Sequence, residues 1–438
     1  MSQNMTTGGW GSRLGFILAS AGSAVGLGAI WKFPYMAGTN GGAVFMLPFI
    51  FFTLTIGVSL LIAEFAMGRA GRQGAVGSLN RVAGKPWGIF GGIGVFTVFL
   101  ILSFYSAVGG WCLKYLWDAI LGNGLITDTA KLGEYFGGFV SNAFDSYGYL
   151  LLFLAVTAYV VMNGIEKGIE KVAKILMPAL FILMLILIVR GVTLPGGWKG
   201  VEFLFTPRWE DFNGSALFNA MGFCFFSLSL GAGTMITYGS YLNPKADLPS
   251  SVGWVAFLAI MAAILGGLMV MPAVFAFNLD PGAGPGLTFA QMPFGHGFAI
   301  AFYACLTVAA LTSSVSMLEA CATLLVQECR LTRRTAILAT LAGCALVGFA
   351  ANMSFGPWGD VKLFGKNIFD LLDYVTSNVG MPLSSFGIAI AAAWVAWPAM
   401  QRELQTTRML PPSVLTTIRI LTGFCAPLFV AGLALGSL

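Results

Sequence analysis

Charged residues are scarce in this sequence of 438 residues, of which only 9% are Asp, Glu, Lys or Arg. A soluble protein of this length needs far more charge to cover its surface, so the shortage excludes that class. Hydrophobic residues make up 57% of the chain, and the mean hydropathy is +0.84. Runs of roughly 20 apolar residues, the length that spans a bilayer, fill nearly the whole sequence. The composition therefore predicts an integral membrane protein in contact with the lipid bilayer.

Residues that bind metals or form disulfides are also scarce. The chain has one histidine, His296, and seven cysteines that form no CxxC pair. A disulfide framework, a zinc site and paired haem ligands are therefore not expected. Because no nucleophile–base pattern is present, we expect no enzymatic activity. We also expect no nucleic-acid partner and no cleavable signal peptide, since the first apolar run continues into "WKFPY".

Apolar runs between polar breaks predict eleven transmembrane helices in an all-α protein. Their approximate ranges are 12–37, 42–69, 88–118, 147–163, 170–190, 214–241, 251–277, 297–326, 334–351, 374–399 and 413–436. Longer loops are expected near 119–146, 191–213 and 352–373. Since no linker divides the chain, we predict one domain, 1–438. Its first repeat covers about 12–190, its second about 214–399, and 413–436 is an extra helix.

Basic residues are concentrated in alternate connections between these segments. They are Arg69, Arg72, Arg81 and Lys85, then Lys167, Lys171 and Lys174, then Arg330, Arg333 and Arg334, then Arg402 and Arg408. Connections rich in Lys and Arg stay on the cytoplasmic side. The pattern predicts a multi-pass protein of the cell (inner) membrane with a cytoplasmic N-terminus and, after eleven spans, an outer C-terminus.

Two predicted spans carry glycine and serine where a transmembrane helix is usually apolar: Gly22–Gly28 in the first and Ser227–Gly233 in the sixth. These residues weaken helices, and unwound backbone at mid-membrane survives only in protein or beside a cavity. Small residues can instead serve tight helix packing, which is the better interpretation for a single segment. Two such segments in corresponding halves favour broken helices around a central binding site, as in inverted-repeat transporters.

Several motifs resemble those of the neurotransmitter:sodium symporter family, whose bacterial members include amino-acid transporters of the leucine-transporter fold. They are "WGSRLGFILASAGSAVGLGAIWKFPY", "IAEFAMGR", "SFYSAVGGW", "FFSLSLG", "AALTSSVSMLE" and "FDLLDYVTSN", and they cover nearly the full length. The resemblance implies that fold, with a 5+5 inverted repeat and helices 1 and 6 broken at mid-membrane.

The resemblance implies one sodium site. Sodium is a hard cation that prefers oxygen ligands. The family's second site would use the carbonyls of Gly22, Val25 and Ala309 and the hydroxyls of Thr312 and Ser313. Hydroxyls in such a run often bond only their own backbone, but their place opposite a helix break favours an ion site.

The family's first sodium site lacks its side-chain oxygens, because Ala29 and Leu258 stand at those positions. We predict that this site is absent or weakened. Chloride is not expected either: Phe49 and Phe223 replace the chloride-binding groups, and Ala262 replaces the substituting glutamate.

The resemblance also implies a substrate pocket with separate ends for a carboxylate, an amine and a side chain. Free N–H groups of a half-helix bind anions well. The implied residues are Ala24, Gly26, Leu27, Gly28, Ile101, Tyr105, Phe226, Ser227, Ser229, Ala232, Ser313 and Met317. Such residues in isolation indicate only core packing. The small Ala232 favours a bulky or aromatic substrate.

Gate residues differ from those of the family. Lys32 replaces the usual arginine that pairs with an outer aspartate, here Asp373, and Lys32 is also a candidate cation for the substrate carboxylate. A lysine that extends to the outer interface is the simpler alternative. At the inner side, Trp10 keeps an aromatic position, whereas Thr7 and Gln327 replace a salt bridge and permit only a hydrogen bond.

Two intramembrane carboxylates are candidates for structural support or coupling, Glu64 and Glu319, because such charges are costly in a membrane. Gly168 and Pro178 match a motif linked in the family to unwinding of the fifth helix. The implied function is sodium-coupled import of a small zwitterion, a neutral or hydrophobic amino acid, by alternating access. A proton-coupled or sodium-independent amino-acid or amine transporter and a non-transporting sensor remain alternatives, and the oligomeric state stays open.

Overall fold

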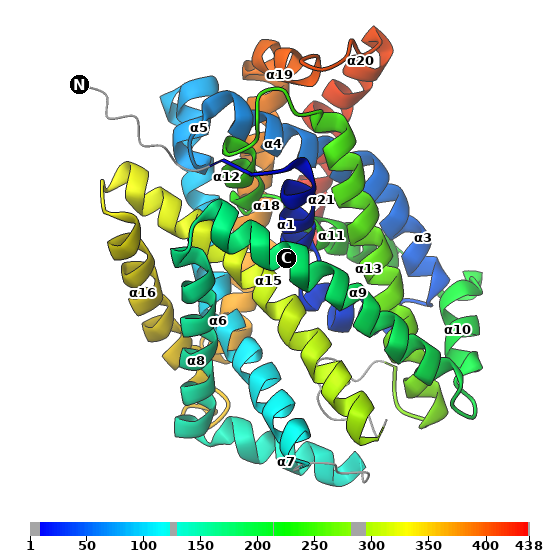
Figure 1. Ribbon diagram of the computed structural model, residues 1–438. Coiled ribbons are helices and arrows are strands. Elements are labelled where there is room, and N and C mark those ends of the chain that lie inside the picture. Colours follow the sequence, from blue (N-terminus) through cyan, green and yellow to red (C-terminus); the bar gives the residue numbers. More distant parts are fainter. Residues whose placement is uncertain (1–8, 123–128, 213, 282–294, 437–438) are drawn as a thin grey trace.

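The computed structural model describes residues 9–122, 129–212, 214–281 and 295–436, which form helices packed side by side (Figure 1). Short 3-10 or π-helical stretches are labelled η. The first half contains α1 (Arg13–Ala24), η1 (Gly28–Lys32), α2 (Phe33–Thr39), α3 (Ala43–Phe52), η2 (Thr53–Gly57), α4 (Val58–Gly71), α5 (Ala75–Val82), η3 (Lys85–Trp87), α6 (Gly88–Leu121), α7 (Thr129–Ser141), α8 (Ala143–Met162), η4 (Ile165–Glu170), α9 (Lys171–Val192) and α10 (Trp198–Phe205). The second half contains η5 (Trp209–Asp211), α11 (Gly214–Ser227), α12 (Thr234–Ser240), α13 (Leu248–Ala276), α15 (His296–Glu328), α16 (Arg333–Met353), α17 (Ile368–Tyr374), η6 (Val375–Gly380), α18 (Met381–Ile390), η7 (Ala391–Val395), α19 (Trp397–Leu404), α20 (Pro412–Ile420), η8 (Leu421–Cys425) and α21 (Ala426–Gly436).

Within these described ranges, nine helical runs are long and apolar enough to cross a membrane. A tenth candidate is the pair formed by α1 and the run Gly28–Thr39, which meet at an angle of 50°. The sixth predicted span consists of α11 and α12, which are separated by residues 228–233. This arrangement is consistent with the eleven predicted spans.

Four short helices lie outside the apolar runs: α5, α7, α10 and α19. The segments 119–146 and 191–213 were expected to be loops, and this is wrong in part, because they contain α7 and α10. With 13 and 8 residues, α7 and α10 are too short to cross a membrane. In Figure 1, α5 and α19 lie at the upper end of the molecule and α7 at the lower end.

The breaks in α1 and between α11 and α12 have a backbone cause. Helix α1 stops at Val25, whose ψ of 65° is not helical. Beyond α11, Ser229, Gly231 and Gly233 have φ angles of 52°, 73° and 71°, in the region that glycine adopts without strain. The Ser229 hydroxyl donates to the Ser23 carbonyl at 3.0 Å, so the two breaks are bonded to each other.

Glu64 of α4 supports the second break. Its Oε1 accepts a hydrogen bond from the Gly231 N–H at 2.7 Å, and the side chain is 1% exposed. A backbone N–H that leaves a helix inside a membrane needs such a partner. Glu64 thus stabilises the unwound segment.

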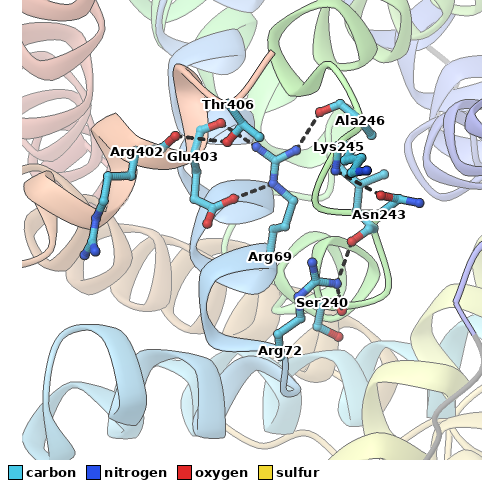
Figure 2. A network of polar contacts seen from close by, with 10 residues as sticks. Arg69, Arg72, Ser240, Asn243, Lys245, Ala246, Arg402, Glu403 and Thr406 are labelled. Atoms are coloured by element: carbon cyan, nitrogen blue, oxygen red, sulfur yellow. Dashed lines mark hydrogen bonds and ion pairs between the residues drawn. The ribbon is translucent and has the colours of Figure 1, made fainter.

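Arg69 of α4 and Arg72, which directly follows α4, bind the backbone at and beyond the end of α12 (Figure 2). Arg69 is 1% exposed, pairs with Glu403 of α19 at 2.5 Å and donates to the Ala246 carbonyl at 2.7 Å. Arg72 donates to the Leu242 carbonyl at 2.6 Å. A buried guanidinium is tolerated when its donors are paired in this way. The end of α12, the connection to α13 and α19 are therefore held on α4.

Candidate functional site

A cavity of about 280 Å³ lies between the two helix breaks. All twelve predicted substrate residues line it, together with Lys32 and Asp373. The structure therefore brings together side chains and backbone from α1, α6, the α11–α12 break and α15. The sequence did not identify several further lining residues, which are Ser23, Trp31, Tyr35, Val98, Phe104, Val108, Thr234, Phe369, Asp370, Ser377 and Met381. Most of these are apolar, and nothing in their local pattern separates them from core residues.

Hydrogen-bonding groups gather where α1 is broken. The Leu27 N–H donates to the Tyr105 hydroxyl at 3.3 Å. A Cβ atom on Gly26 would approach the Ser313 and Tyr105 oxygens, and one on Gly28 would collide with the Phe226 ring. The glycines therefore allow α6, α11 and α15 to approach the α1 backbone closely. A phenol hydroxyl at the N-terminus of a half-helix is suited to bind a carboxylate.

Oxygen atoms from α1 and α15 meet beside this cavity. The Ser313 hydroxyl donates to the carbonyls of Gly22 at 3.1 Å and Ser23 at 3.3 Å. The Thr312 hydroxyl bonds its own helix at the Ala309 carbonyl, 3.1 Å away. A Cβ on Gly22 would lie 3.1 Å from the Thr312 Cβ, so the two helices touch at this point. Carbonyls and hydroxyls at such a junction are ligands that suit a hard cation.

Ala29 and Leu258, predicted to replace the side-chain ligands of the family's first sodium site, both pack within the helix bundle. Ala29 is 4% exposed, and its carbonyl faces Gly266 of α13. Leu258 is half-buried on α13.

Phe49 and Phe223, predicted to replace the family's chloride-binding groups, belong to a cluster of aromatic rings. Phe33, Phe45, Phe49 and Phe223 are 0–1% exposed, with ring centroids 5.0–5.9 Å apart. Ala262 is also fully buried. These groups offer carbon rather than hydrogen-bond donors to an anion.

The Lys32 ammonium lies over the ring of Phe226. Its Nζ is 4.1 Å from the centroid of the Phe226 ring, a cation–π geometry. Asp373 accepts a hydrogen bond from Ser377 at 3.2 Å. Among the ion pairs of the described residues, none joins Lys32 to Asp373. The two predicted gate residues thus share a cavity without touching.

The two intramembrane carboxylates have different surroundings. Glu319 is fully buried and accepts hydrogen bonds from Arg333 at 2.5 and 3.0 Å and from Tyr241 at 2.8 Å. Sequence reasoning missed Arg333, which lies fourteen positions away on the next helix. Glu64 has the Gly231 N–H at one oxygen, while its Oε2 has no hydrogen-bond partner within the described part of the chain.

Two of the predicted inner gate residues, Trp10 and Gln327, lie in the described part of the chain. The Trp10 indole N–H donates to the Tyr238 carbonyl at 3.0 Å, which joins the start of α1 to α12. The Gln327 amide oxygen accepts from the Gly74 N–H at 2.7 Å. Thr7 lies outside the described residues.

The fifth span begins with a π-helix, η4, that contains Gly168, and Pro178 lies inside α9. Beside η4, a cavity of about 10 Å³ is lined by Ala19, Gly22, Ile169, Val172, Ala173, Tyr238, Thr312 and Val315. That volume is about one water molecule. Since Gly22 and Thr312 line it, this small cavity adjoins the oxygen cluster described above.

Comparisons with known proteins agree over nearly the whole chain. The model of the sodium:neurotransmitter symporter family matches residues 7–125 and 143–438. YhdH of Bacillus subtilis (strain 168), an uncharacterized sodium-dependent transporter, is 40% identical over 389 residues, or 87% of this chain and 86% of that protein. An uncharacterized sodium-dependent transporter of Haemophilus influenzae is 34% identical over 420 residues, covering 91% and 92%. The crystal structure of MhsT in complex with L-phenylalanine has 38% identity and a TM-score of 0.91, and the match covers 98% of this chain and 100% of that chain.

Proposed function

The chain belongs to the sodium:neurotransmitter symporter family, and from that premise we propose that it imports a neutral or hydrophobic amino acid with one sodium ion. The family match and the likeness to MhsT confirm the predicted family, the leucine-transporter fold and a transporter rather than an enzyme. The protein is thus a multi-pass membrane transporter of the sodium-dependent type. The substrate, the number of ions and the roles of individual residues belong to the proposal.

The observation that carries the substrate proposal is the convergence of twelve predicted residues on one cavity of about 280 Å³. Its α1 end offers the Leu27 N–H and the Tyr105 hydroxyl, which suit a carboxylate. The Ser227 and Ala24 regions provide carbonyls for an amine. The small Ala232 leaves room for a large side chain, and the MhsT complex contains L-phenylalanine. A bulky or aromatic zwitterion fits this arrangement.

One sodium ion, at the Gly22, Val25, Ala309, Thr312 and Ser313 oxygens, is the coupling ion of the proposal. The hydrogen bonds of Ser313 and Thr312 place both hydroxyls among the carbonyls. At the first site, Ala29 and Leu258 supply no side-chain oxygen, and the ring cluster of Phe49 and Phe223 supports the absence of chloride coupling.

Without a first sodium ion, other groups must balance the negative charge of the substrate carboxylate. The half-helix N–H groups and Tyr105 supply part of it. Lys32 is the candidate cation, since its ammonium lies over Phe226 at the wall of the same cavity. A cation–π contact is weak enough, at about 0.5–2 kcal/mol, for the ammonium to move toward a carboxylate.

The transport cycle follows alternating access. Sodium favours the outward-facing state, substrate completes closure, and sodium leaves through the small cavity beside η4 toward the basic, cytoplasmic end. An ion shifts such an equilibrium only by the difference in its affinity for the two states. The cytoplasmic N-terminus and the inner-membrane location are parts of this proposal.

The experiment is thermal unfolding of the purified protein with a panel of amino acids and amines, in sodium and in choline buffer. A ligand that binds the folded state raises the apparent stability by mass action. We expect at least one bulky neutral amino acid to stabilise the protein in sodium only. Equal stabilisation in both buffers would contradict sodium coupling.

A proton-coupled transporter is the second candidate, and Glu64 is the observation that favours it. Its unpartnered Oε2 and its lack of a paired cation among the described residues distinguish it from Glu319, which Arg333 neutralises. Glu64→Gln would keep the Gly231 hydrogen bond and remove the titration. Uptake driven by a proton gradient in choline that disappears in Glu64→Gln would favour this candidate.

A further inference from the structure

A buried carboxylate joins the start of α1 to the start of the fifth span. Glu170, the last residue of η4, is 2% exposed. It accepts hydrogen bonds from the Gly11 N–H and the Ser12 hydroxyl, both at 2.7 Å, and pairs with Lys174 at 2.6 Å. Hydrogen bonds to an ionised acceptor are about twice as strong as neutral ones. Glu170 is therefore a strong contact between two segments far apart in sequence.

The first turn of α1 is shaped to receive this carboxylate. Ser12 is the N-cap of α1 and also accepts from the Gly15 N–H at 3.0 Å. A Cβ on Gly15 would collide with the Glu170 carboxyl group, so glycine provides the space. A negative charge is stabilised at a helix N-terminus by the helix dipole. The contact thus combines three donors, a close fit and a favourable field.

This contact lies in line with the proposed sodium site. Ser12, Gly15, Ala19 and Gly22 are spaced by three and four residues, which places them on one face of α1. Gly22 contributes a proposed sodium ligand, and Ala19 and Gly22 line the small cavity. Ser12 lies ten residues from Gly22, or about 15 Å along the helix. Along α1, the oxygen cluster at Gly22 comes first, the small cavity next, and Glu170 last, nearest to the connections that are rich in Lys and Arg.

On the side of the fifth span, the small cavity and Glu170 are also next to each other. Ile169 and Ala173 line the small cavity and flank Glu170 in sequence. Trp10, which precedes Gly11 and Ser12, binds a different helix, because its indole N–H donates to the Tyr238 carbonyl of α12. The residues at the family's usual inner gate, Thr7 and Gln327, carry no charge, and Gln327 is engaged with Gly74.

We propose that Glu170 is the cytoplasmic latch of this transporter, which holds the start of α1 against η4 while the inner exit is closed. The part that concerns sodium rests on the proposed function. A sodium ion that leaves through the small cavity along α1 and η4 meets the Glu170 carboxylate. The ion and the Gly11 and Ser12 donors compete for the same two oxygens, so ion exit and the opening of α1 favour each other.

The latch is tested by hydrogen–deuterium exchange on the full-length protein in choline buffer, without substrate. Glu170→Gln removes the charge and weakens all three contacts. We expect the amides from Gly11 to Leu18 to exchange at least about tenfold faster, since hydrogen bonds to charged groups contribute about 1.5–3 kcal/mol. Amides of α16 stay unchanged.

Glu166→Gln is the matched control, because Glu166 is an exposed acid one turn earlier in η4 whose side chain also lies beside Gly11. Unlike Glu170, it makes no hydrogen bond or ion pair to Gly11 or Ser12 among the contacts of the described residues. The control variant should leave the exchange of α1 unchanged. Unchanged exchange in Glu170→Gln, or an equal rise in the control, would overturn the latch. If Glu170→Gln does not fold, Glu170→Asp decides: it keeps the charge and the N-cap but shortens the side chain by one methylene, so it should raise the exchange of the same amides measurably, and no rise would overturn the latch.

A second readout separates the latch from the proposed function. A weaker latch favours the inward-facing state, so Glu170→Gln should lower the apparent sodium affinity several-fold in thermal unfolding. If exchange rises but sodium affinity does not change, the ion part of the inference is wrong. If sodium fails to stabilise the wild-type protein, the proposed function fails, whereas the exchange result still decides the latch.

Discussion

The junction of α1 with α15 and the region of Ala29 and Leu258 differ in what they offer a cation. At the first, the Ser313 hydroxyl bonds the Gly22 carbonyl and the Thr312 hydroxyl bonds the Ala309 carbonyl, so oxygen atoms meet across two helices. At the second, Ala29 and Leu258 present methyl groups. Gly22 lies just before the break in α1, and Ala29 lies just after it, against Gly266 of α13. A broken helix therefore frees carbonyls, but the neighbouring side chains decide whether an ion can be held.

The largest effect is expected when the oxygen-rich region is made like the apolar one. Thr312→Ala/Ser313→Ala removes both hydroxyl ligands while the backbone carbonyls remain. We expect the apparent sodium affinity to fall about 100-fold or more, because each contact to a charge contributes about 1.5–3 kcal/mol. Thermal unfolding against sodium concentration measures this. Thr157→Val, which removes a buried hydroxyl bonded at Ser314, is the control, and a retained sodium effect in the double variant would contradict the assignment.

A smaller effect is expected at the carboxylate end of the cavity. Tyr105→Phe removes the hydroxyl beside the Leu27 N–H and keeps the ring. Loss of one hydrogen bond to a charged group should weaken substrate binding about tenfold. Equilibrium binding in saturating sodium provides the test. An equal loss for the substrate's amide derivative, which has no carboxylate, would show that Tyr105 acts elsewhere.

The converse change should make the apolar region resemble the oxygen-rich one. Ala29→Asn/Leu258→Asn introduces two amide oxygens next to the α1 break, where hard cations prefer such ligands. We expect the dependence of substrate binding on sodium to become steeper, with a Hill coefficient above one, and the affinity to rise several-fold. A Hill coefficient that stays at one would mean that more than these two side chains is missing.

The smallest effect, no change, is expected from chloride. Phe49 and Phe223, which the family resemblance implies stand at the positions of the chloride-binding groups, pack with the rings of Phe33 and Phe45. Replacing chloride by gluconate in a sodium buffer should leave substrate binding unaltered. A loss of affinity in gluconate would place an anion site elsewhere in the protein.

Structural features that interrupt an apolar run locally, such as the helix breaks, could be predicted from the sequence. The breaks near Gly22–Gly28 and Ser227–Gly233 belong to this group, since glycine and serine stand out in a transmembrane run. The cavity residues followed from the family resemblance once the breaks were located. The helices α7 and α10 were missed because they are short and only partly apolar.

Contacts between distant side chains could not be predicted. In "IEKGIEK", Glu166 and Glu170 have nearly identical neighbours in sequence, yet Glu170 is buried and accepts hydrogen bonds from Gly11 and Ser12, whereas Glu166 is exposed. Arg333 reaches Glu319 through the packing of α16 on α15, which no local pattern records. Among the described residues, Lys32 lies over Phe226 rather than in an ion pair with Asp373, and its sequence neighbours do not determine this choice.

The number of sodium ions bound to each chain tests the central claim most directly. Equilibrium binding of radioactive sodium to the purified protein, at saturating substrate, counts them. One ion per chain, lost in Thr312→Ala/Ser313→Ala, is the predicted result. Two ions per chain would contradict the account, because Ala29 and Leu258 would then adjoin a working site.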